Sequence, residues 1–148
     1  MKNRILFLTI LMMNFCLTLK AQINDSLTLQ IFENKTFNAR EIIGLKDFKY
    51  EPQISIIELA QSDDVYGNIT TFKNGKFTSG NIGPCGNECR VTVSGTYSFT
   101  GNKIYLFLET IFFWKECSHE PKQTINKEIG TFNWEQEEDG TVKLSLVN

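Results

Sequence analysis

The sequence predicts an all-β protein of about eight antiparallel strands with at most one short helix. Short runs rich in β-branched and aromatic residues recur along residues 22–148 at intervals of about ten to fifteen residues, and turn signals separate them. No internal repeat or low-complexity segment interrupts this spacing. An up-and-down barrel and a two-sheet sandwich both accommodate that number of strands, and the pattern leaves the choice between them open.

Residues 1–21 have the three-part pattern of a cleavable export signal. Two basic residues precede a nearly unbroken apolar run over residues 5–19, and Ala21 places a small residue before the cut. A membrane anchor is the alternative, but the run is shorter than the ~20 apolar residues that a spanning helix needs. We therefore expect cleavage after Ala21 and a single antiparallel β domain over residues 22–148.

Export predicts that the domain matures in the periplasm or outside the cell, with no transmembrane segment once the signal is removed. A lipoprotein signal at Cys16 is a further alternative, but the bulky Phe15 stands where a small residue is expected. Loss of the signal, which holds three basic residues and no acidic one, changes the formal net charge from −2 to −5. A negative domain without a Lys/Arg cluster excludes nucleic acid as a partner, because phosphate neutralisation supplies most of that affinity.

The first strands are expected at residues 36–43 and 53–60, from their β-type composition. Residues 26–32 fit either a strand or a short helical turn. The clearest hairpin spans residues 67–81, because the Asn-Gly pair at 74–75 supplies the two positive φ angles of a type I′ turn.

A second hairpin joins residues 90–99 to residues 103–113 through a Gly-Asn turn. Apolar and hydroxyl side chains alternate along its first strand, which predicts a half-buried strand. The apolar set is Val91, Val93, Tyr97 and Phe99, and the hydroxyl set is Thr92, Ser94, Thr96 and Ser98. The second strand is apolar on both faces, so we expect it to lie centrally or to have one face covered by another part of the structure.

The chain closes with a third hairpin, formed by residues 123–135 and 141–147 around an acidic turn. The last strand alternates, with Val142, Leu144 and Leu146 inward. At Gly130 the two-residue period of the preceding strand slips by one position. A β-bulge at that glycine is the expected cause.

Three cysteines remain after cleavage, and in an exported chain one disulfide is the default expectation. Cys89 and Cys117 stand at the same open end of the second hairpin, so we prefer a bridge between them. Bridges from Cys85 to Cys117 and from Cys85 to Cys89 are the alternatives. Each choice leaves one thiol free.

A zinc set of Cys85, Cys89, Cys117 and His119 competes with the disulfide, although the oxidising compartment and the close Cys-x-His spacing oppose it. His119 is the only histidine and lies in a polar stretch typical of an exposed loop. No spacing distinguishes a catalytic carboxylate pair or a calcium loop. We therefore expect no enzyme, no metal and no cofactor.

Aromatic residues gather in the two strands 103–113 and 123–135 and their immediate continuation. Most of them should form the core, while the surplus either lines a ligand cavity or forms an exposed contact patch. For a cavity, the expected lining residues are Tyr97, Phe99, Phe107, Phe132 and Trp134.

Gly95-Thr-Tyr97, Gly101-Asn102 and Cys117 resemble the Gly-x-Tyr strand, Gly-Asn turn and second cysteine of META domains. The chain departs from that family where Arg90 follows Cys89 in place of Asn. It also lacks the family's Thr-x-Met-Ala-Cys ending over residues 110–117.

Residues 33–37 are similar to the first strand of exported bacterial lipocalin-like proteins, with Phe37 in place of Trp. Residues 72–77 and 95–104 resemble two later hairpins of that group. Both resemblances imply a small β domain without a cofactor or an active site. The expected function is binding of a small apolar ligand in a lipocalin-like cavity. The alternative is a protein-interaction or inhibitor module with a solid core, an exposed aromatic patch and another envelope or extracellular protein as partner.

Overall fold

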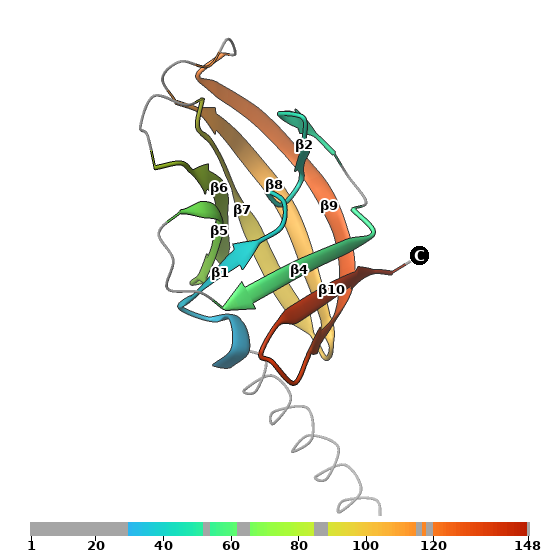
Figure 1. Ribbon diagram of the computed structural model, residues 1–148. Coiled ribbons are helices and arrows are strands. Elements are labelled where there is room, and N and C mark those ends of the chain that lie inside the picture. Colours follow the sequence, from blue (N-terminus) through green and yellow to red (C-terminus); the bar gives the residue numbers. More distant parts are fainter. Residues whose placement is uncertain are drawn as a thin grey trace, which may run out of the picture.

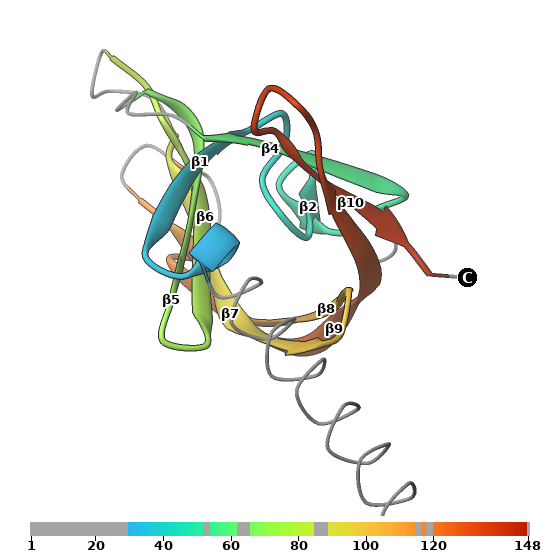
Figure 2. The same ribbon diagram turned by 90° about the horizontal axis from the view of Figure 1, so that it is seen from below.

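Eight antiparallel strands close into a barrel in this computed structural model, which describes residues 30–51, 54–61, 66–84, 89–114, 117 and 120–147 (Figures 1 and 2). The barrel strands are β1 (Lys35–Ala39), β4 (Ile56–Gln61), β5 (Gly67–Lys73), β6 (Lys76–Ile82), β7 (Val91–Thr100), β8 (Lys103–Phe113), β9 (Lys122–Gln136) and β10 (Val142–Leu146). The predicted all-β fold is confirmed, and of the two architectures left open it is the barrel that forms.

The strands from β5 to β10 follow the order of the chain, each pairing with the next. The first strand departs from that order, since β1 lies between β4 and β5 and pairs with both. β4 then closes the ring by pairing with β10. The barrel therefore differs from a plain up-and-down meander only at β1 and its two neighbours.

One turn and one β-bulge form where the sequence predicts them. Asn74 (φ 52°) and Gly75 (φ 71°) form the tight turn between β5 and β6. The ladder between β8 and β9 shifts register between Leu106 and Phe107, next to Gly130 (φ 155°). The predicted hairpin and the predicted bulge are both confirmed.

The N-terminal elements are shorter than predicted. β1 ends at Ala39 instead of residue 43, and β4 begins at Ile56 instead of residue 53. Residues 30–32 are helical, which agrees with the helical alternative for the segment 26–32, whose first part lies outside the described residues. In Figure 1 this turn lies at the lower end of the barrel, which is the end that faces the viewer in Figure 2.

A small hairpin of β2 (Leu45–Lys46) and β3 (Lys49–Tyr50) is an element that the sequence did not predict. Its tip has two positive φ angles, at Asp47 (48°) and Phe48 (61°), without a glycine. The hydroxyl of Tyr50 donates a hydrogen bond to the carbonyl oxygen of Glu128, so the hairpin packs against β9. It covers a part of β9 that β10 does not reach.

Inward side chains fill the barrel in the alternating pattern expected of half-buried strands. β7 contributes Val91 and Val93, both fully buried, and β10 contributes Val142 and Leu144. β8 buries Ile104, Leu106, Leu108, Ile111 and Phe113 on one face. Its other face carries the exposed rings of Tyr105 and Phe107.

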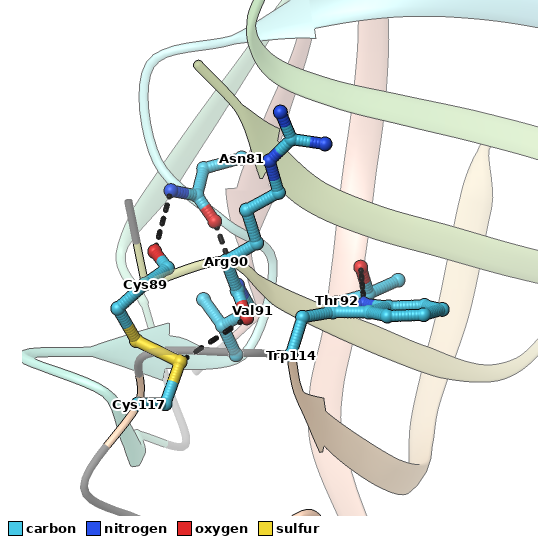
Figure 3. The surroundings of a disulfide bond; sticks show 7 residues. All are labelled: Asn81, Cys89, Arg90, Val91, Thr92, Trp114 and Cys117. Atoms are coloured by element: carbon cyan, nitrogen blue, oxygen red, sulfur yellow. Dashed lines mark hydrogen bonds between the residues drawn. A yellow bond between two sulfur atoms is a disulfide. The ribbon is translucent and has the colours of Figure 1, made fainter. Parts of the chain in front are cut away.

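A disulfide joins Cys89 to Cys117, whose Cα atoms lie 4.7 Å apart (Figure 3). The preferred pairing is confirmed, and two of the four candidate zinc ligands are thereby bonded to each other. The other two, Cys85 and His119, lie outside the described residues, as does the export signal. Disulfides persist in oxidising compartments, so the bridge is consistent with export.

Within the described ranges, no helix combines the length and the apolar character that crossing a membrane requires. Over the same ranges, no three side chains of His, Cys, Asp or Glu come together as a metal site.

Candidate functional site

The residues expected to line a ligand cavity divide between the two faces of the sheet. Phe132 is fully buried, Tyr97 is 8% exposed, and Phe99 and Trp134 pack against the same core. Phe107 lies on the outer face and is 39% exposed. Four of the five therefore share the barrel interior, and the fifth belongs to a different surface.

Phe32 occupies the space between these inward residues. Its side chain is fully buried, and its ring centroid lies 5.0 Å from that of Phe99 and 5.8 Å from that of Trp134. The ring of Phe72 meets it edge-on at 5.3 Å. Such tilted and edge-to-face pairs are the favoured packing of aromatic rings. The helical turn of residues 30–32 thus places the Phe32 side chain inside this end of the barrel. We call this side chain the plug.

Glu33 holds the plug in place. One carboxylate oxygen accepts a hydrogen bond from the backbone N–H of Asn74 at 2.7 Å, and the other accepts from the hydroxyl of Tyr97. The bond from Asn74, with help from Tyr97, lowers the pKa of Glu33 below its ordinary value. Burial, together with the Glu33 carboxylate, raises the pKa of Tyr97 well above its ordinary value.

Acid should weaken this contact, because a carboxyl group with a depressed pKa binds fewer protons in the folded state than in the unfolded state. The resulting stabilisation is present above the ordinary carboxyl pKa and is lost as the pH falls through the lowered pKa of Glu33. We expect Glu33→Gln to lower the free energy of unfolding at pH 7 and to match the wild type near pH 2. Urea denaturation at the two pH values measures this.

Glu138→Gln, on the exposed turn after β9, is the matched control and should follow the wild-type pH profile. A Glu33→Gln deficit of equal size at both pH values would show that the carboxylate charge is not what holds the plug.

The outer surface of β7 and β8 carries the second group of aromatic residues. We call this surface the aromatic face. It comprises Tyr105, Phe107, Phe112 and Trp114, together with Thr92, Ser94, Thr96 and Ser98. Tyr105 and Phe107 are each 39% exposed, and Trp114, just beyond β8, is 59% exposed. Apolar surface of this kind, gathered on one side of a sheet, is typical of a contact site.

The pairing of β7 with β8 places a hydroxyl beside each ring. Thr96 pairs with Phe107, and Ser98 pairs with Tyr105. A hollow of about 480 Å³ opens over these four residues and reaches Glu128 of β9. The hollow is therefore walled by two rings and by the hydroxyl side chains of Thr96 and Ser98, with the charge of Glu128 at its edge.

The end of the aromatic face near the disulfide is held by several contacts (Figure 3). The indole N–H of Trp114 donates to the hydroxyl oxygen of Thr92 at 3.3 Å, and its backbone N–H donates to the carbonyl oxygen of Arg90 at 2.8 Å. The Cys117 sulfur lies 3.5 Å from that same carbonyl oxygen. The bridge from Cys117 to Cys89 and the Trp114–Arg90 hydrogen bond thus both join this end of the face to the residues before β7.

Further along β8, the ammonium group of Lys122 lies 5.4 Å from the centroid of the Phe112 ring. The hydroxyls of Ser94 and Thr110 form a 2.6 Å hydrogen bond between β7 and β8. The face is thus built on two paired strands, whose register shifts once, between Ser94 and Gly95.

Sequence reasoning identified the surplus of aromatic residues on β8 and the hydroxyl row on β7, but not Tyr105 as part of the face. No signal in the sequence marks it, because residues 104–107 are apolar on both faces of the strand. Phe32 was missed as well, because its position depends on how a short turn docks against distant strands.

In comparisons with known proteins, no family model, no curated protein and no solved structure matches this chain. The resemblances to META domains and to lipocalin-like proteins stay predictions, and the function has to be argued from the geometry.

Proposed function

We propose that this chain is an exported binding module that docks another envelope or extracellular protein through its aromatic face. The observation that carries the proposal is that Tyr105, Phe107 and Trp114 stay exposed on one sheet face while Phe32 fills one end of the barrel interior. Export rests on the predicted signal and agrees with the disulfide.

The chemistry of the aromatic face suits a protein partner. Tyr and Trp supply large, rigid contact area at low entropic cost, and short hydroxyl side chains supply adaptable hydrogen bonds. The centres of protein interfaces are likewise depleted in charge and enriched in aromatic residues. The hollow over Thr96 and Phe107 has the size to take one apolar side chain of the partner.

A small apolar ligand inside the barrel has less support. Such a ligand would have to displace Phe32 from its contacts with Phe72, Phe99 and Trp134. It would also have to break the two hydrogen bonds of Glu33. The barrel architecture is compatible with a lipocalin-like binding domain, but the interior of this one is occupied by its own side chain.

Photo-crosslinking in the cells that make the protein tests the proposal. With p-benzoylphenylalanine at Thr96, we expect one discrete adduct with another protein. The same group at Glu138, on the exposed turn after β9 and outside the aromatic face, should give none. Combining Tyr105→Ser with Phe107→Ser should reduce the Thr96 adduct at least ten-fold, because loss of an aromatic anchor costs about 2 kcal/mol or more.

Tyr66→Ser serves as the matched control, since that ring is 54% exposed but lies outside the face. Equal adducts at Thr96 and Glu138, or an adduct that survives the double substitution in folded protein, would rule the aromatic face out.

A further inference from the structure

One stretch of the barrel wall lacks a neighbouring strand. β4 pairs with β10 through Ile56–Leu59 but with β1 only through Leu59–Gln61. Beside residues 56–58, on the side of β1, none of the described strands pairs with β4. An unpaired strand edge of this kind is a template for another chain.

The main-chain groups of two residues point into this gap. The Ser55 carbonyl oxygen accepts a hydrogen bond from the N–H of Leu146 at 3.0 Å, so Ser55 faces β10. Because bonding direction alternates along an antiparallel strand, Ile57 also faces β10. The N–H and C=O groups of Ile56 and Glu58 therefore face the gap.

The gap is held open by contacts that draw the chain after β1 away from β4. The carbonyl oxygen of Arg40 accepts from the side-chain amide of Asn68 on β5 at 2.9 Å. The N–H of Ile43 donates to the buried hydroxyl oxygen of Ser79 on β6 at 3.1 Å. Residues 40–43 are thus bonded to β5 and β6, and the edge of β4 is left without them.

A cavity of about 500 Å³ occupies this place, and we call it the β4 slot. Its walls include Ile42, Ile43 and Ile57, of which the last two are almost fully buried. Arg40 and Lys46 line it as well, and so do three carboxylates. The slot therefore combines an apolar floor with charges of both signs.

We propose that the β4 slot binds an extended segment of another polypeptide by strand addition. Such a segment would pair with Ile56 and Glu58 and place one apolar side chain on the isoleucine floor. Main-chain bonds give affinity in this mode of recognition, and the pocket for an alternate side chain gives specificity. A purely apolar ligand would leave the polar groups of the strand edge unpaired, at about 1–3 kcal/mol each.

The β4 slot is separate from the aromatic face. In the closed order of strands, β4 lies four places from β7 in either direction, which puts the two sites on opposite walls. The inference therefore goes beyond the proposed function and does not rest on it.

Selection from a phage-displayed library of random seven-residue peptides, with the whole purified protein as bait, tests the proposal. We expect enriched peptides with one apolar residue between residues of strand-forming type. Glu58→Pro should weaken their binding at least ten-fold, because proline removes the N–H that faces the slot and leaves the bonds to β10 intact. Glu58→Ala keeps that N–H and should bind within about three-fold of the wild type.

Hydrogen exchange gives a readout that does not depend on a variant folding. The amides of Ile56 and Glu58 should exchange at least ten-fold more slowly when a selected peptide is bound. Phe107→Ser should leave this protection unchanged, which separates the β4 slot from the aromatic face.

Three outcomes would overturn the proposal. They are the absence of any enriched peptide, equal binding to Glu58→Pro and Glu58→Ala, and a dimer of this chain whose Glu58 amide is protected without peptide. The last would mean that a second copy fills the slot.

Discussion

Replacing Gly95 with alanine is expected to destabilise the protein by more than about 3 kcal/mol, enough to prevent folding of a domain of marginal stability. A Cβ atom at this position would lie 2.0 Å from the carbonyl oxygen of Phe107 and 2.6 Å from the ring of Phe77. The first of these is main chain of β8, which is paired on both sides and has no room to move. Relief would require breaking the ladder next to the register shift between Ser94 and Gly95.

Gly101→Ala is the matched control for Gly95→Ala. A Cβ at Gly101 would meet no atom within 4 Å, and its positive φ of 61° makes the expected cost only about 1 kcal/mol. Urea denaturation followed by far-UV circular dichroism compares the two variants. A Gly95→Ala protein as stable as Gly101→Ala would mean that β7 and β8 are not packed this closely.

Phe32→Ala should cost about 3–5 kcal/mol, the range for removal of a fully buried phenylalanine. Loss of four ring contacts and the cavity left at the end of the barrel both contribute. Because an apolar cavity of this kind stays dry, it should bind benzene. Benzene is therefore expected to raise the melting temperature of Phe32→Ala and to leave that of the wild type unchanged.

Tyr66→Ala is the control for this experiment, since an exposed ring should change the free energy of unfolding by no more than about 0.5 kcal/mol. Wild-type stability for Phe32→Ala would show that the helical turn is not docked against the barrel. Benzene binding by the wild type would revive the interior as a ligand site.

The features that sequence predicted are those fixed by neighbouring residues. The turn at Asn74 and Gly75 needs two positive φ angles, and an Asn-Gly pair is the usual sequence signal for such a turn. The bulge at Gly130 appears as a slip in a two-residue period. The hairpin tip at Asp47 and Phe48 carries no such signal, because neither of its two positive φ angles falls on a glycine.

Pairing between distant strands could not be predicted from the sequence, because neighbouring residues do not determine it. Nothing local distinguishes β1 beside β4 and β5 from β1 at some other place in the sheet. Hence the barrel was predicted only as one of two architectures, and the β4 slot was not foreseen at all.

In the candidate sites too, the features fixed by neighbouring residues were predicted and those fixed by distant contacts were not. The alternation that predicted inward Tyr97 and outward Thr96 also separates the two faces of the sheet. Which face has room for a partner depends on Phe32, whose docking the sequence left undetermined. Once that plug is in place, the surplus rings of β8 become the accessible apolar surface.

The pairing of β4 with β10 has a consequence for the stage of folding at which the barrel closes. It joins Ile57 to Leu144, which are far apart in the sequence, so the ring is completed by the last described strand. Contacts of such long sequence separation form late, because the entropy of closing the loop must be overcome first. Until β10 is available to pair with β4, the other strands can form only an open sheet, and the barrel closes when that pairing forms.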